Sequence, residues 1–184
     1  IDPKDILVLS FTNAAADHIK AIEPSVISAT IATMINTIYS ANYAHQISSE
    51  ETLANTLDVV CKHDKCAYTL AEILRLNIEG PGRTRGSSMT KLGAIINLFE
   101  FVNKNITDVI RVLDKVGQTT LLLQSIIAYN LIDTLKEPSS IASKHIIIDE
   151  VQDTSTFEFA YILKYATKHK ESVFMFGVSS QTLY

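Results

Sequence analysis

The chain has 184 residues, of which 47% are hydrophobic, and its 16 basic and 20 acidic side chains give a formal net charge of −4. This composition suits a globular protein with a sizeable core and excludes an overall basic binder of nucleic acid, so any contact with DNA has to be local. Two cysteines are too few for a disulfide framework, and without a signal peptide or a membrane-length apolar run we expect a cytoplasmic protein with no membrane partner.

The first part of the chain alternates predicted strands and helices. Residues 6–9 form a continuous apolar run, which is typical of a strand covered on both faces in a parallel sheet. After this run, Asn13 is placed to cap a helix that ends near Pro24. A second strand is predicted over residues 26–31 and a second helix over residues 33–43. This order indicates an α/β fold.

The middle of the chain, from about residue 46 to residue 140, has helical apolar spacing and no predicted strand. The helices are expected over residues 50–61, 68–77, 88–103, 107–116 and 119–135. A core-facing stripe recurs every four residues along the last of them, at Leu123, Ile127, Leu131 and Leu135. This stretch therefore predicts an all-α insertion.

The alternating pattern resumes after Pro138. Two buried strands and the helix between them are predicted over residues 145–148, 172–176 and 155–167. We therefore expect an α/β domain with a mostly parallel sheet, formed by residues 1–44 and 141–184, and a helical subdomain inserted over residues 45–140.

The strongest chemical signal follows the predicted strand at residues 145–148. Residues 149–154 read D-E-V-Q-D-T, so two adjacent acids stand at the carboxyl end of an apolar strand, the edge where open α/β sheets bind ligands. At such an edge Asp149 can hold a Mg²⁺ ion that bridges nucleotide phosphates, and Glu150 can orient or deprotonate the attacking water. An Asp-Glu pair taken alone would favour a charged turn, since such pairs are common after strands.

Longer stretches of sequence favour the catalytic interpretation, because they resemble the motifs of a known family. Residues 149–153 resemble the Walker B motif of UvrD/Rep-type superfamily 1 DNA helicases, usually D-E-x-Q-D. Residues 10–16, S-F-T-N-A-A-A, resemble motif Ia of that family, usually T-F-T-N-x-A-A. Residues 177–184, G-V-S-S-Q-T-L-Y, resemble motif III, usually G-D-x-x-Q-S-I-Y. These helicases also insert a helical subdomain before Walker B, so the chain resembles part of their first motor domain, a RecA-like P-loop NTPase fold.

The resemblance implies an ATP-dependent helicase that moves in the 3'-to-5' direction, with ATP and Mg²⁺ as cofactors and a role in DNA repair or replication. It implies that Asp149 holds Mg²⁺ through water, that Glu150 acts on the attacking water and that Gln181 reaches the γ-phosphate. It also implies a set of residues that face single-stranded DNA or a junction with duplex: Phe11, Thr12, Asn13, Thr30 and Tyr184. In a bacterium such a protein would be associated with the nucleoid.

The sequence departs from the family pattern at several points. Thr30 fits a segment that usually reads G-T-F-H-S-L, but Ile31 and Ala32 stand where the family has Phe and His. Val178 replaces an acidic residue of motif III. The chain has no phosphate-binding loop of the form G-x-x-x-x-G-K-[ST]. We therefore expect a fragment that lacks this loop and the second motor domain, and that does not hydrolyse ATP alone.

Two alternatives to a complete motor remain open. The departures at Ala32 and Val178, together with the acidic net charge, motivate a catalytically inactive helicase-like domain that binds DNA or a protein. The motor part of a helicase-nuclease subunit would carry the same motifs as a helicase. Flanking sequence distinguishes these alternatives.

Two weaker groups lie in the insertion. Arg83 and Arg85, in a glycine-rich loop, can grip nucleic-acid phosphates, and an ordinary solvated loop is an equal alternative. Cys61, His63 and Cys66 are metal-capable, but a structural zinc site needs four ligands. Small core cysteines beside a turn are the favoured interpretation.

Overall fold

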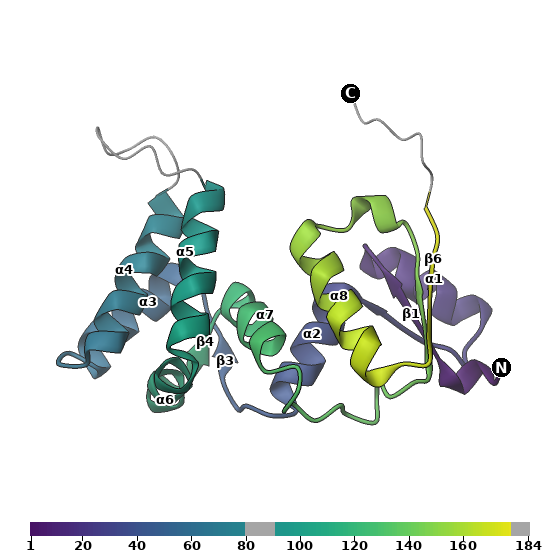
Figure 1. Cartoon of the computed structure of the whole chain (residues 1–184), viewed down its shortest axis with the longest axis horizontal. Coiled ribbons are helices and arrows are strands. Elements are labelled where there is room, and N and C mark those ends of the chain that lie inside the picture. Colours follow the sequence, from purple (N-terminus) through teal and green to yellow (C-terminus); the bar gives the residue numbers. More distant parts are fainter. Residues whose placement is uncertain (80–90, 178–184) are drawn as a thin grey trace. The chain divides into compact units, whose positions relative to one another are not determined.

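The computed structural model describes residues 1–79 and 91–177 (Figure 1). The chain forms two compact units, the first from Ile1–Asn42 with Leu131–Tyr184 and the second from Tyr43–Asn130. The sequence placed the second boundary near residue 140, whereas residues 131–140 belong to the first unit. Each unit is described by itself below.

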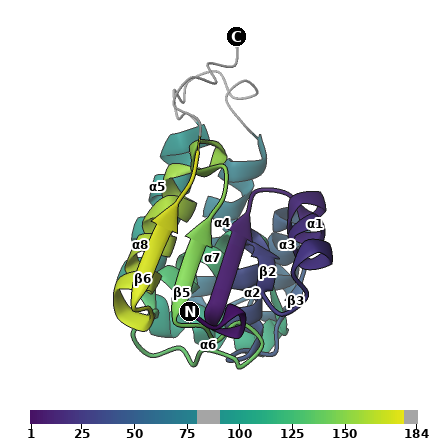
Figure 2. The same cartoon turned by 90° about the vertical axis from the view of Figure 1, so that its right-hand side faces the viewer.

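A four-stranded parallel sheet forms the centre of the first unit. Its spatial order is β2 (Ile27–Thr30), β1 (Ile6–Ser10), β5 (His145–Ile148) and β6 (Ser172–Met175). All three neighbouring pairs are parallel. Figure 2 shows β1, β5 and β6 side by side with their arrowheads at one edge. The prediction of an α/β fold with a mostly parallel sheet is confirmed.

The helices of the first unit connect the strands across both faces of the sheet. They are α1 (Asn13–Ile22), α2 (Ile31–Ser40) and α8 (Thr156–His169), with short 3-10 turns at Pro3–Asp5 and Val151–Asp153. The step from β1 to β2 and the step from β5 to β6 run in opposite directions, so right-handed crossovers place α1 and α8 on opposite faces. Figure 1 shows α2 and α8 together on one side of the strands. The direction of winding reverses between β1 and β5.

Two threonines determine where the first helices begin. The Thr12 side chain accepts a hydrogen bond from the Ala15 N–H (3.2 Å) and caps α1, so the prediction that Asn13 is the cap was wrong by one residue. Thr30 caps α2 by accepting from the Thr33 N–H (3.1 Å). The helix therefore starts at Ile31, two residues before the predicted start at residue 33, because the Thr30 side chain satisfies one of the backbone N–H groups that a helix leaves free at its beginning.

The segment after α7 (Leu121–Asn130) is irregular, so the helix predicted to extend to residue 135 was too long. The segment is fixed to the first unit by polar contacts. The Asn42 amide donates to the Lys136 carbonyl (3.1 Å) and accepts from the Lys136 N–H (3.0 Å). The Lys170 ammonium, whose side chain is 0% exposed, pairs with Glu137. The last helical bond runs from the Leu135 N–H to the Leu131 carbonyl (3.0 Å), and the next N–H, that of Lys136, donates to the Asn42 side chain instead.

The second unit is mainly helical. Its helices are α3 (Glu50–Val60), α4 (Lys65–Glu79), α5 (Lys91–Lys104), α6 (Ile106–Val116) and α7. The prediction of no strand here was wrong, because β3 (Gln46–Ile47) pairs in parallel with β4 (Gln118–Thr119). A two-residue pair is too short for apolar alternation to reveal. In the described part of the chain, no helix combines the length and apolar character that crossing a membrane requires.

Candidate functional site

Most of the sequence-predicted residues that the structure describes come together at one edge of the sheet. Thr30 ends β2, Phe11 follows β1, and Asp149 and Glu150 follow β5. In the strand register Ser10 pairs with Thr30, and Leu9 pairs with Ile148. The carboxyl ends of the parallel strands therefore bring these loops to the same edge, at the arrowheads in Figure 2.

This edge contains the topological switch point of the sheet. After β1 the chain turns towards β2, and after β5 it turns the other way towards β6. Open α/β sheets bind ligands in the crevice outside the strand ends at such a point. Phe11, 54% exposed, follows one of these strands, and the half-buried Asp149 follows the other. The edge between β1 and β5 is therefore the candidate site.

The turn after β5 contains a β-bulge. The Phe176 N–H donates to the Ile148 carbonyl (2.8 Å), and the Phe176 carbonyl accepts from the Val151 N–H (3.0 Å). In a regular parallel ladder the N–H of Glu150, two positions after Ile148, would donate to the Phe176 carbonyl. Val151 donates instead, so the β5 side of the ladder contains one extra residue. On the other side the Asp149 N–H still donates to the Leu9 carbonyl (2.9 Å). Asp149 thus stays anchored to β1 while Glu150 is pushed out of the ladder.

Glu150 adopts a left-handed backbone conformation, with φ 53° and ψ 47°. Among the described residues it is the only non-glycine residue with positive φ. Such strain concentrates at functional sites. The exposed Glu150 carboxylate accepts a hydrogen bond from the Gln152 side-chain amide, and the Glu150 N–H donates to Asp149 Oδ1 (3.1 Å). Two carboxylates with oxygens open to solvent can hold a divalent cation and orient a water molecule.

The loop after β1 offers an aromatic ring and a helix N-terminus. Phe11, Thr12 and Asn13 are all exposed. Thr12 is occupied as the cap of α1, and the Ser10 hydroxyl donates to the Thr12 carbonyl (3.0 Å), which fixes the turn. Thr30 differs, because it is 8% exposed and its hydroxyl donates to Thr33 Oγ1 (2.8 Å). The exposed contact surface of this edge is therefore provided by residues 11–13.

Several predicted residues lie outside the described part of the chain. They are Gln181 and Tyr184 of the motif III string, Val178 beside them, and Arg83 and Arg85 of the insertion. The structure adds two residues to the site that the sequence reasoning gave no role, Gln152 and Gly177. The only sequence signal for them was their membership of the Walker B and motif III strings.

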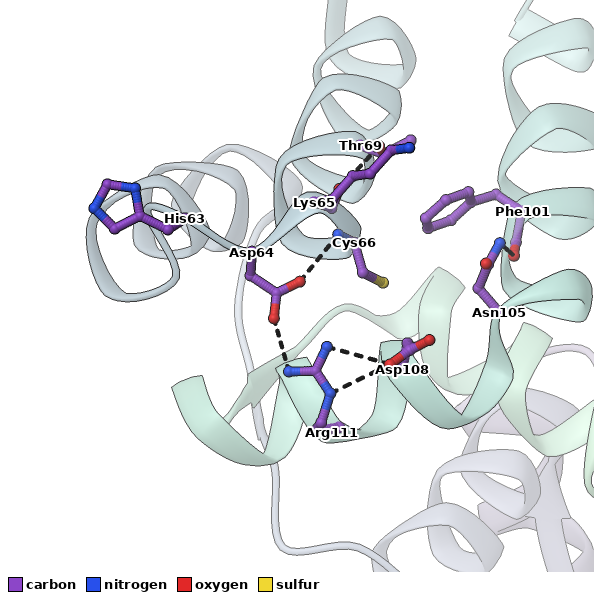
Figure 3. Close-up of a pocket in the computed structure, with 9 residues that line it drawn as sticks. All are labelled: His63, Asp64, Lys65, Cys66, Thr69, Phe101, Asn105, Asp108 and Arg111. Carbon is purple, nitrogen blue, oxygen red and sulfur yellow. Dashed lines mark hydrogen bonds and ion pairs between the residues drawn. The ribbon is translucent and has the colours of Figure 1, made fainter.

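A separate pocket of about 480 Å³ lies in the second unit and is lined by the segment that contains Cys66 (Figure 3). Figure 3 shows Arg111 between Asp64 and Asp108. Its guanidinium lies 2.7 Å from Asp64 Oδ2 and 3.3 Å from Asp108 Oδ1. The hydrogen bond from Arg111 lowers the pKa of Asp64, and burial raises the pKa of the Cys66 thiol to about 11. The thiol is therefore protonated near neutral pH and a poor nucleophile.

Ion pairs between helices give the charged residues of this pocket a structural role. Asp64 also accepts from the Cys66 N–H (2.9 Å) at the start of α4, so its carboxylate ties α4 to α6 through Arg111. Cys61 is 3% exposed at the end of α3. Within residues 1–79 and 91–177, no three His, Cys, Asp or Glu side chains are grouped so that they could hold a metal ion.

The sequence matches no protein-family model and no curated protein. What the site does is therefore inferred from its own residues and geometry.

Proposed function

We propose that this chain is part of the RecA-like first motor domain of a UvrD/Rep-type superfamily 1 DNA helicase, in which ATP hydrolysis drives 3'-to-5' movement along single-stranded DNA. One observation carries the proposal. The two strings that suggested the family, at residues 10–16 and 149–153, follow neighbouring strands on either side of the switch point. Nothing in the strings themselves requires this adjacency, so it supports the proposal independently.

In this proposal the acidic pair serves ATP and Mg²⁺. Carboxylate oxygens are the ligands that Mg²⁺ prefers. The hydrogen bond from the Asp149 N–H to the Leu9 carbonyl fixes the backbone that carries the first carboxylate beside the sheet. Asp149 holds the ion through water, and the exposed Glu150 accepts a proton from, or orients, the attacking water. A Mg²⁺ ion held there would neutralise charge on the phosphates.

The phosphate-binding loop has to come from another segment or chain, because this sequence contains none. Among the described strands none pairs with β6 on the side away from β5, and this edge is the place for it. Phe174, Met175 and Phe176 are 45%, 40% and 56% exposed there, on alternate faces of the strand. A further parallel strand beside β6 would cover this edge. Its carboxyl end would then lie two strand spacings from β5, about 10 Å away.

Residues 11–13 serve DNA in this proposal. The exposed Phe11 ring offers a face on which a base can stack, and stacking tolerates any sequence. Thr12 and Asn13 stand at the N-terminus of α1, where backbone N–H groups and short polar side chains suit a phosphate. Thr30 supports this surface as the cap of α2.

Binding of fluorescently labelled single-stranded DNA to this chain at low salt tests the DNA side directly. Because Phe11→Ala removes the ring on which one base would stack, we expect it to weaken the affinity for DNA by about tenfold. The matched control is Tyr68→Ala, which removes another exposed aromatic ring (63% exposed) from the second unit and should change little. Equal affinities of Phe11→Ala and the unaltered chain, or no measurable binding, would contradict a DNA surface at this edge.

A further inference from the structure

The Gln152 side chain lies between the Glu150 carboxylate and Gly177. Its Nε2 donates to Glu150 Oε2. On the other side, a Cβ atom built on Gly177 would overlap Gln152 Oε1 and lie 2.9 Å from Val151 Cγ1. Real Cβ atoms do not approach other atoms so closely, so any larger residue at position 177 would displace Gln152 or Val151. Glycine at position 177 leaves free the space beside the Gln152 amide.

Gly177 is also the residue at which the chain leaves the bulge. The neighbouring Phe176 is bonded through its N–H to Ile148 and through its carbonyl to Val151, so it closes the bulge that contains Glu150. A Cβ atom at position 177 would therefore meet Gln152 beside this bulge. Glu150 itself is in a left-handed conformation, and its carboxylate accepts the hydrogen bond from the Gln152 amide at the bulge.

We propose that Gln152 is a positioning residue for the Glu150 carboxylate, and that glycine at position 177 leaves the space in which the Gln152 amide takes this position. The proposal rests on the proposed function, because it needs Glu150 to act on the attacking water. It adds a contact that holds the reactive carboxylate in place. Gln152 does not touch the reacting atoms in this scheme.

The contact is tested first in this chain, without any assay of activity. The ¹H–¹⁵N signals of the Gln152 side-chain amide and the exchange rate of the Val151 N–H are recorded for Gly177→Ala, Gln152→Ala and Glu150→Gln. We expect Gly177→Ala and Glu150→Gln to shift the Gln152 amide signals, and Gly177→Ala to speed Val151 exchange at least tenfold. The glycine control is Gly117→Ala, which strains a left-handed residue (φ +67°) in open space in the second unit. Unchanged Gln152 signals in Gly177→Ala would overturn the contact.

The positioning role is tested by ATP hydrolysis in the protein from the complete open reading frame. We expect Gln152→Ala and Gly177→Ala each to lower kcat about tenfold, with KM for ATP within twofold of the unaltered protein. The kcat of the double variant should be no lower than that of the less active single variant. Normal kcat in both variants, with activity lost in Glu150→Gln, would leave the contact structural and overturn the positioning role. An inactive wild-type protein would overturn the proposed function and this role together, while the amide signals would still decide the contact.

Discussion

Glu150 shows how the contacts around a single residue can hold its backbone in a conformation that the residue itself disfavours. The left-handed conformation (φ 53°) costs a residue with a Cβ atom about 1–2 kcal/mol, and glycine avoids this cost at the expense of greater freedom in the unfolded chain. The bulge places the residue there because Phe176 is bonded to both Ile148 and Val151. A glutamate occupies this position in spite of the strain.

Replacing Glu150 by glycine should therefore stabilise the chain relative to alanine. Both variants remove the hydrogen bond with Gln152, so their difference isolates the backbone strain. We expect the free energy of unfolding of Glu150→Gly to exceed that of Glu150→Ala by about 1 kcal/mol in denaturant titrations. An alanine variant as stable as the glycine variant would mean that residue 150 is not left-handed in solution.

A second residue-scale prediction concerns Lys170, whose buried ammonium pairs with Glu137. Lys170→Met leaves the largely buried Glu137 carboxylate without its charged partner, so we expect a loss of about 3 kcal/mol in the free energy of unfolding. Lys168→Met is the matched control, because its pair with Asp133 is exposed (side chains 36% and 68% exposed) and should contribute less than about 1 kcal/mol. Similar losses in both variants would contradict the buried pair.

At the scale of elements, strong local signals predicted the strands and helices well, and long-range contacts account for the errors. The buried strand at residues 145–148 was placed correctly because four apolar residues in a row suit a strand covered on both faces. The end of α7 was missed because Leu135 continues the apolar stripe, yet it is buried in the first unit rather than on the helix. The short pair β3 and β4 depends on backbone bonds such as Gln46 N–H to the Gly117 carbonyl (2.9 Å), which no local pattern reveals.

The open edge of β6 gives a prediction for this element. Because parallel strands alternate the direction of their N–H groups, the amides of Val173 and Met175 should point away from β5, whereas Phe176 donates to Ile148. We expect hydrogen exchange in this chain to be at least tenfold faster at Val173 and Met175 than at Phe174 and Phe176. Slow exchange at all four amides would show that something already covers the edge.

At the scale of the whole molecule, the sheet that carries the site is assembled from both ends of the sequence. Residues 1–42 supply β1 and β2, and the chain from residue 131 onwards supplies β5 and β6. The sequence predicted this arrangement because the alternating pattern stops and later resumes. It placed Phe11 after the first strand and Asp149 at the carboxyl end of the strand at residues 145–148, and the structure shows that these two strands are neighbours. The bulge and the fit of Gln152 against Gly177 could not be predicted, since both arise from contacts between β6 and the turn after β5.

The most direct test of the motor is DNA-stimulated ATP hydrolysis by the protein from the complete open reading frame, compared with its Glu150→Gln variant. We predict hydrolysis that requires single-stranded DNA and falls by about 100-fold or more in the variant, because an amide cannot accept the proton of the attacking water. DNA binding by the variant should be retained, since Phe11 and its neighbours are unchanged. A protein that possesses a phosphate-binding loop but shows no DNA-stimulated hydrolysis, or a fully active Glu150→Gln variant, would contradict the motor and favour a helicase-like domain that only binds.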